Sequence, residues 1–173
     1  MSPLRRLLVL RHAESARPSG VKDCDRPLTP RGRGDAHIVG RVLAESHWLP
    51  DLVLSSTARR ARETWDLAAT EMGGAPSVRY DPWLYHPSLR VLLQTVRDTP
   101  RRVHTLLLVG HNPSVQEAVV TLAGDGVGDA LRRVRAAFPT AAIARLTWWG
   151  AWTQLTPDSA LLIDVAVPHR RED

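Results

Sequence analysis

The chain has 173 residues, of which 43% are hydrophobic and 24% charged, so its size and composition fit one globular domain over residues 1–173 and exclude a disordered chain. The formal net charge is +5, with Lys22 as the only lysine, but the arginines are scattered and form no basic run, which argues against a nucleic-acid partner. Cys24 is the only cysteine and the first apolar stretch is too short to cross a membrane, so we expect a cytoplasmic protein with neither disulfides nor a membrane partner.

The first predicted element is the apolar run Leu7–Leu10, which ends abruptly at a cation and an imidazole. Because a half-exposed strand would alternate with polar residues, this continuous run indicates a strand buried on both faces of a parallel sheet. Thr29-Pro30 is a helix start signal, with threonine as the N-cap and proline at the first helical position. We expect that helix to end near Glu45.

Strand-like and helix-like stretches continue to alternate along the rest of the chain. The pattern predicts strands over 50–56, 78–80, 105–109, 141–148 and 160–167, and helices over 61–72, 88–96 and 114–122. Glycines at 124, 126 and 128 follow a helix rather than a strand, so they predict a loop and not a phosphate cradle. This alternation is typical of an α/β protein, a three-layer α/β/α sandwich around a mostly parallel sheet.

Basic side chains follow the ends of several predicted strands. Arg11 and His12 follow the first strand, the arginine-rich segment 59–62 follows the second, and His111 follows the strand over 105–109. The carboxyl ends of parallel strands meet at one edge of a sheet, where ligand crevices form. Two imidazoles with several guanidiniums and no acidic cluster make a poor metal site and a good phosphoryl pocket, so we expect neither a metal nor another cofactor.

The segments that carry these residues resemble the motifs of the histidine phosphatase superfamily, the phosphoglycerate mutase-like fold, and in particular its short SixA-like branch of protein phosphohistidine phosphatases. The match runs from Leu7 to about Leu122, and ordered motifs at compatible spacing are a strong signal where one alone is weak. Its segments are Arg11-His12-Ala13-Glu14-Ser15, with alanine in place of the commoner glycine; Asp25-Arg26-Pro27-Leu28-Thr29; Ser56 to Thr64, with Thr57 in place of the usual proline; and Gly110-His111-Asn112-Pro113.

The resemblance implies a role for each basic residue of the pocket. His12 is then the nucleophile that carries the phosphoryl group as phosphohistidine, while Arg11, Arg60 and His111 bind and polarise that group. The register of the segment from Ser56 to Thr64 selects Arg60, rather than the arginine before it, as the phosphate ligand. Arg26 is either a further phosphate contact or an arginine of a surface loop.

The implied function is that of a metal-independent phosphatase acting through a covalent phosphohistidine. Its partner is a phosphorylated protein, such as a histidine-phosphotransfer domain. The alternatives are a phosphatase of a small phosphorylated metabolite or nucleotide, and a non-catalytic phosphate-binding module.

Two sequence features favour the protein substrate. Where many family members carry a general acid, the segment 81–86 offers only Asp81 and His86, neither in a recognisable acid motif. The absence of a strong general acid matters less when the leaving group is imidazole, which departs readily from phosphorus. The stretch from Gly74 to Thr105 is also too short for the helical insertion that covers the pocket of mutases, so we expect an open pocket with no large lid.

The remaining polar and aromatic candidates are expected to have structural roles. Glu14 should turn away from the pocket, because a carboxylate pointing inward would repel an anion. The aromatic residues Trp148, Trp149 and Trp152 predict a packing cluster or a partner surface. Of the other histidines, we expect His37 and His47 to face solvent, His104 to lie at a sheet edge, and His169 to belong to a charged tail.

Overall fold

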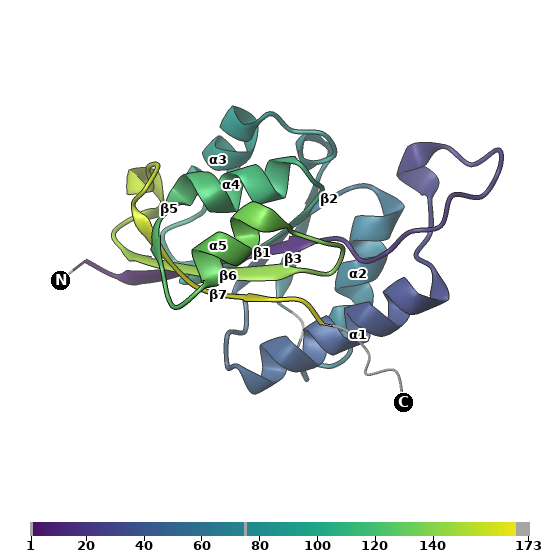
Figure 1. Ribbon diagram of the computed structural model, residues 1–173, viewed down its shortest axis with the longest axis horizontal. Helices are drawn as coiled ribbons and strands as arrows, with labels where there is room; N and C mark the ends of the chain where they lie inside the picture. Colours follow the sequence, from purple (N-terminus) through teal and green to yellow (C-terminus); the bar gives the residue numbers. More distant parts are fainter. Residues whose placement is uncertain (1, 75, 169–173) are drawn as a thin grey trace.

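The computed structural model describes residues 2–74 and 76–168 (Figure 1). Short 3-10 turns lie in three of the connections: η1 (Asp23–Asp25), η2 (Pro82–Leu84) and η3 (Trp152–Gln154). The strands are β1 (Leu4–Arg11), β2 (Leu52–Ser56), β3 (Ser77–Asp81), β4 (Thr105–Gly110), β5 (Ala123–Gly126), β6 (Ile143–Trp149) and β7 (Ala160–Ala166). The α-helices are α1 (Pro30–Glu45), α2 (Arg59–Ala69), α3 (Leu89–Arg97), α4 (Ser114–Leu122) and α5 (Ala130–Ala136).

The strands form one seven-stranded sheet with the order β3-β2-β4-β1-β6-β7-β5. β1 lies at its centre, parallel to β4 and antiparallel to β6. β2 and β3 extend the parallel part, whereas β6 runs against both of its neighbours. This arrangement confirms the predicted mostly parallel sheet. It also brings the carboxyl ends of β1, β2 and β4 to the same edge of the sheet.

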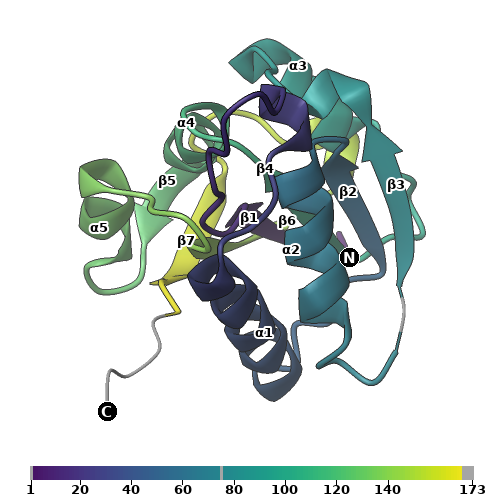
Figure 2. The same ribbon diagram turned by 90° about the vertical axis from the view of Figure 1, so that its right-hand side faces the viewer.

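Helices cover both faces of the sheet, so the molecule has the predicted three layers (Figure 2). Leu8 and Leu10 of β1 pack with buried residues of α1 and α2, while Leu7 and Val9 pack with those of α3, α4 and α5. All four side chains are 0% exposed, and burial of each contributes about 1.5–3 kcal/mol. The end of β1 is therefore a rigid place from which to present a side chain.

The start of α1 braces the loop that follows β1. The hydroxyl of Thr29 accepts a hydrogen bond from the Gly32 N–H at 2.9 Å, as the N-cap signal predicts. The backbone N–H of Thr29 donates to the carbonyl oxygen of Glu14 at 3.0 Å. A Cβ on Gly32 would lie 2.1 Å from that same oxygen, so only glycine allows this approach.

The glycine-rich segment after α4 is not the predicted loop. Residues 123–126 form β5, which pairs parallel with β7 at one edge of the sheet. Gly124 permits this pairing, because a Cβ there would lie 2.1 Å from the carbonyl oxygen of Asp158. Gly128, with φ of 57°, then turns the chain into α5, a short helix that the sequence pattern did not predict.

No large insertion separates β3 from β4 in the described chain, as expected. The connection between these two strands contains only the turn η2 and the nine residues of α3 as regular structure. Among the described residues, no helix is long and apolar enough to cross a membrane.

The aromatic cluster near the end of β6 divides into two parts. Trp148 and Trp152 are buried and meet edge to face with ring centroids 4.8 Å apart, and Trp152 donates its indole N–H to the carbonyl oxygen of Val103 at 2.7 Å. Trp149, in contrast, is 70% exposed. The cluster is therefore largely core packing.

Three of the described histidines, His37, His47 and His104, do not line the pocket that contains His12. His47 and His104 are exposed. His37 is only half-exposed and its Nδ1 lies 2.7 Å from the carboxylate of Glu71, so it joins α1 to the turn after α2 instead of simply facing solvent. His169 lies outside the described residues.

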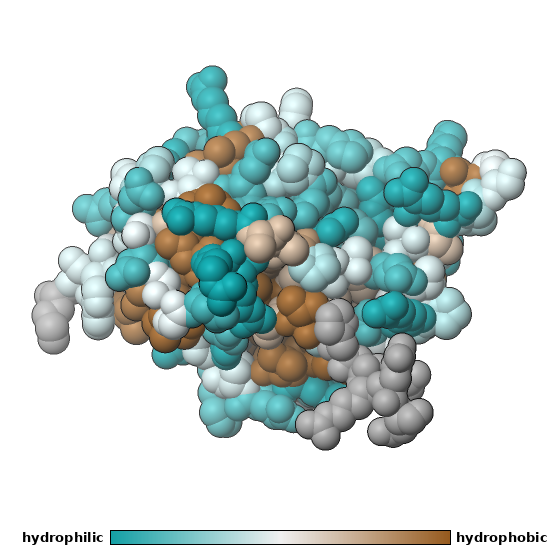
Figure 3. Space-filling model, in the orientation of Figure 1, coloured by the Kyte–Doolittle hydropathy of each residue, from teal (hydrophilic) through white to brown (hydrophobic). Residues whose placement is uncertain are grey.

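The face of the molecule seen in Figure 1 mixes hydrophilic and hydrophobic side chains (Figure 3). Hydrophobic surface appears around α5 and β7, where Val127 is 54% exposed and Leu161 is 36% exposed. Hydrophilic side chains separate the hydrophobic areas on this face, so they do not merge into one apolar surface.

Candidate active site

A polar pocket of about 270 Å³ lies at the carboxyl ends of the parallel strands. In the β1–β4 register Arg11 pairs with Gly110, and the N–H of His12 donates to the carbonyl oxygen of Gly110 at 3.0 Å. His12 and His111 therefore leave neighbouring strands at the same level, with ring centroids 5.1 Å apart. The pocket is lined by Arg11, His12, Glu14, Ser15, Arg17, Arg26, Arg60, His86, His111, Asn112 and Thr140.

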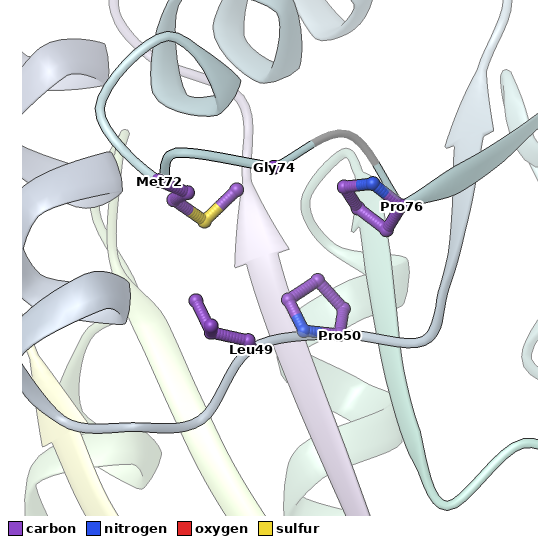
Figure 4. A pocket seen from close by; sticks show the side chains of 5 residues that line it. All are labelled: Leu49, Pro50, Met72, Gly74 and Pro76. Carbon is purple, nitrogen blue, oxygen red and sulfur yellow. The ribbon is translucent and has the colours of Figure 1, made fainter.

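A second hollow, of about 230 Å³, lies away from this edge, next to the amino ends of β2 and β3 (Figure 4). It is lined by Leu49, Pro50, Met72, Gly74 and Pro76. Since none of these residues carries a titratable group, the hollow offers no chemistry to a substrate.

His12 is held as a neutral imidazole with one free nitrogen. It is 8% exposed, and its Nδ1 lies 2.7 Å from the carbonyl oxygen of Ala13. Because a carbonyl only accepts, Nδ1 carries the proton and Nε2 keeps a lone pair. Burial, followed by the charges of Arg60 and Arg11, lowers the pKa of His12 to about 4 against the opposing effect of the Ala13 hydrogen bond. His12 is therefore neutral at pH 7, with Nε2 free to act as a nucleophile.

A buried hydroxyl fixes the loop that carries this nucleophile. Thr64 of α2 is 0% exposed and accepts a hydrogen bond from the N–H of Ala13 at 2.9 Å. The same hydroxyl donates to the carbonyl oxygen of Arg60 at 2.6 Å. One side chain thus ties the residue after His12 to the helix that presents Arg60.

His111 leaves one ring nitrogen, Nδ1, available to a ligand. Its Nε2 lies 2.8 Å from the hydroxyl of Ser56, which also accepts the N–H of Ala58 at 3.2 Å. A hydroxyl has one donor and two acceptor sites, so Ser56 occupies Nε2 of His111 in either tautomer, and the tautomer in which Ser56 donates to Nε2 carries the imidazole proton on Nδ1. Nδ1 is buried without a protein hydrogen-bond partner. Burial, then the charge of a protonated His12, lowers the pKa of His111 to about 3.

Arg11 and Arg60 bring guanidiniums to the pocket, whereas Arg59 does not. Arg11 donates from Nη1 to the carbonyl oxygen of Phe138 at 3.0 Å, and Arg60 is only 4% exposed. The Nε atoms of both are buried without a protein partner. Arg59 points outward and pairs with Glu63 at 2.6 Å. The structure therefore distinguishes the two adjacent arginines in the way the motif register predicts.

Arg26 forms part of the pocket wall and is not a solvent-facing loop arginine. Its side chain is 14% exposed. Nε donates to the carbonyl oxygen of Ala16 at 2.9 Å, Nη2 to the hydroxyl of Ser15 at 2.7 Å, and Nη1 to the carboxylate of Asp23 at 2.9 Å. Its guanidinium is thus largely engaged with the wall itself.

Two carboxylates near the pocket behave differently from each other. Glu14 accepts a hydrogen bond from the hydroxyl of Thr29 at 2.8 Å at the start of α1, yet it lines the pocket and does not turn wholly away from it as expected. Asp81 accepts from the N–H of Trp83 at 2.9 Å and caps η2, so it does not line the pocket. His86 does line it.

Sequence reasoning missed several neighbours of the basic residues. Asp23 binds both Arg26 and Arg60, Tyr85 donates to Asp23, and Ser56 binds His111. Asn112 donates to the same carbonyl oxygen of Phe138 as Arg11 does, at 3.0 Å. Only position within or beside a motif could have suggested these residues, because their contacts span long stretches of sequence.

This arrangement suits a phosphoryl group. A neutral nucleophilic imidazole lies beside a second imidazole, the buried guanidinium of Arg60 and the partly buried guanidinium of Arg11, all with unused hydrogen-bonding capacity. In the described part of the chain, no three histidine, cysteine or acidic side chains are grouped as metal ligands.

The lowered histidine pKa values predict how stability depends on pH. Both folded values, about 4 for His12 and about 3 for His111, lie below the ordinary 6.5, so between these limits the unfolded chain binds more protons. The stability that these two histidines contribute is therefore fully present above pH 6.5 and is lost as the pH falls toward the folded pKa values. Calorimetry should show the unfolding temperature falling as the pH is lowered through this window, and falling less steeply for His111→Gln. Parallel curves for the two proteins would contradict the assignment.

The fold and pocket together define an α/β protein built to hold a phosphoryl group against a neutral histidine. A family model described as histidine phosphatase superfamily (branch 1) matches residues 7–145. The chain belongs to this superfamily, and it is a phosphatase.

Similar proteins place the chain within the superfamily. A candidate phosphohistidine phosphatase SixA from Nakamurella multipartitia shares 32% sequence identity and a TM-score of 0.83, covering 96% of this chain and 98% of that one. A second candidate SixA, from Agrobacterium tumefaciens, shares 29% identity and a TM-score of 0.81, covering 97% and 100%. An uncharacterized protein of Mycobacterium tuberculosis is 39% identical over 162 residues, covering 92% of this chain and 100% of the relative. These similarities confirm the predicted phosphoglycerate mutase-like fold and its SixA-like branch.

Proposed function

We propose that the chain removes phosphoryl groups through a covalent intermediate on His12 and needs no metal. The observation that carries this proposal is the hydrogen bond from Nδ1 of His12 to Ala13, which leaves the Nε2 lone pair free. Nε2 attacks phosphorus, the bond to the leaving group breaks, and water then takes the phosphoryl group from His12.

The neighbouring residues hold the phosphoryl oxygens during both steps. Arg11 and Arg60 supply guanidinium donors whose Nε atoms are buried without protein partners, and His111 supplies the Nδ1–H. Because these donors are fixed before substrate arrives, they stabilise the charge of the transition state without reorganising. Arg26 adds positive charge at the wall of the pocket and orients Asp23.

The proposed substrate is phosphohistidine on another protein, such as a histidine-phosphotransfer domain. Two similar structures carry the name SixA phosphohistidine phosphatase, which supports this choice. The short connection between β3 and β4 leaves the pocket open to a side chain presented by a partner. Of the two acid candidates, Asp81 caps a turn, and His86 is exposed at the mouth.

Leaving-group preference tests this proposal. With EDTA present, we expect kcat/KM to fall in the order phosphohistidine, aryl phosphate, alkyl phosphate, because an alkoxide needs a strong acid and imidazole does not. A missing acid accounts for about 10²- to 10⁴-fold between the ends of this series. Sugar phosphates or phosphoglycerates turned over as fast as phosphohistidine would contradict the substrate assignment and favour a small metabolite or nucleotide.

A further inference from the structure

Asp23 places a carboxylate beside the phosphoryl pocket that the mechanism above does not use. Its Oδ2 accepts a hydrogen bond from Nη2 of Arg60 at 3.1 Å and one from the hydroxyl of Tyr85, and its Oδ1 accepts one from Nη1 of Arg26 at 2.9 Å. These donors come from the β1–α1 connection, from α2 and from the segment after η2. The carboxylate is therefore fixed from three sides.

The charged and titratable groups around Asp23 keep it anionic. The hydrogen bond from Tyr85, followed by that from Arg26, holds the pKa of Asp23 well below its ordinary range, and Arg60 acts in the same direction against partial desolvation. His86 completes the surroundings, with Nε2 at 4.0 Å from Oδ2. Asp23 is thus a fixed negative charge at any pH near neutrality.

Asp23 lies at the edge of the pocket and contacts two of the residues that line it, Arg26 and Arg60. Arg60 links Asp23 to the pocket, because it binds Asp23 through Nη1 and Nη2 while its buried Nε has no protein partner. His86, within 4.0 Å of Asp23, lines the same pocket. The Asp23 side chain is 49% exposed, so it is accessible to a group entering at the mouth.

Phosphohistidine presents a chemical need that such a carboxylate meets. Its ring departs as neutral imidazole only if the nitrogen that does not carry phosphorus is protonated, and departs as the much poorer imidazolate otherwise. An imidazole ring titrates near neutral pH, so the protonated form is not secured by solvent alone. A fixed carboxylate within hydrogen-bonding reach favours that cationic form.

We propose that Asp23 accepts a hydrogen bond from the protonated distal nitrogen of phosphohistidine and thereby determines the preference for an imidazole leaving group. This inference rests on the function proposed above. Nε2 of His12 forms a bond to phosphorus as the substrate P–N bond breaks, and the electron pair of that bond returns to the departing nitrogen. The distal nitrogen keeps its proton, so neutral imidazole leaves and no further acid is required.

The same carboxylate works against other substrates. A phosphoester whose leaving group carries its own carboxylate, such as a phosphoglycerate, places a second negative charge near Asp23 and is repelled. An aryl phosphate carries neither an N–H nor a second charge on its leaving group. The kcat/KM for an aryl phosphate therefore measures only the effect that Asp23 has through Arg60 on the phosphoryl group.

The test compares Asp23→Asn with wild type on phosphohistidine, an aryl phosphate and 3-phosphoglycerate. Dividing each kcat/KM by that for the aryl phosphate removes any effect transmitted through Arg60. We expect the phosphohistidine ratio to fall about 10- to 100-fold, the loss that a charge-assisted hydrogen bond carries, and the phosphoglycerate ratio to rise. The alkaline limb of the phosphohistidine pH profile should also move to lower pH, because the imidazolium is no longer favoured.

Two further variants make the test specific. Asp25→Asn removes a carboxylate from the same turn, and within the described structure Asp25 makes no side-chain hydrogen bond or ion pair, so both ratios should stay at the wild-type value. Asp23→Glu keeps a carboxylate and should restore part of the phosphohistidine ratio. Equal losses on phosphohistidine and aryl phosphate in Asp23→Asn would overturn the inference, as would unchanged ratios. Wild type inactive on all three substrates would instead overturn the proposed function.

Discussion

Replacing His12 by alanine is expected to abolish turnover while leaving the fold intact. The side chain extends from a loop at the end of β1, so its removal takes away the nucleophile without disturbing Leu7–Leu10 in the core. His111, the other buried imidazole of the pocket, does not have the same arrangement, because its Nε2 is occupied by Ser56. Steady-state assays with an aryl phosphate and a thermal melt measure the two parts of this expectation.

A matched control separates loss of the nucleophile from loss of any histidine. His47 is exposed and lies past the end of α1, so His47→Asn should keep full activity. Appreciable turnover by folded His12→Ala would contradict the covalent mechanism.

Replacing Arg60 by alanine should cause the second largest loss. The guanidinium is buried and its Nε is free of protein partners, so it provides a desolvated contact to phosphate that strengthens in the transition state. We expect a cost on the order of 3 kcal/mol, which corresponds to more than 100-fold in kcat/KM.

The neighbouring arginine is the control for this prediction. Arg59 has a half-exposed side chain and pairs with Glu63 on the outer surface of α2, so Arg59→Ala should change kcat/KM little and stability by less than about 1 kcal/mol. Equal losses of kcat/KM in the two variants would contradict the assignment of Arg60 alone as the phosphate ligand.

The sequence was informative where a single element carried its own signal. The unbroken apolar run before Arg11 predicted a central strand, because only burial on both faces tolerates such a run. The Thr29-Pro30 signal predicted where α1 begins, since capping is a local interaction, and the expected end near Glu45 agrees with the structure. With β1, β2 and β4 parallel, the strand ends that carry Arg11, His12 and His111 had to meet at one edge.

The remaining features depend on contacts between distant segments. Asp23 meets Arg60 and Tyr85 only because η1 folds back across α2 and η2, and nothing in a local pattern anticipates that return. β5 was missed because its pairing with β7 depends on the close approach that Gly124 permits. α5 has only seven residues, too few for a clear helical period.

The central claim, a phosphoryl group carried by Nε2 of His12, is tested most directly by trapping the intermediate. Wild type mixed with substrate and quenched within one turnover should carry phosphate that is stable in base and labile in acid, as expected of a phosphorus–nitrogen bond. Peptide mapping under basic conditions should locate it on His12, and His12→Ala should carry none. Acid-stable phosphate, or phosphate located on Ser15 or Ser56, would contradict the account.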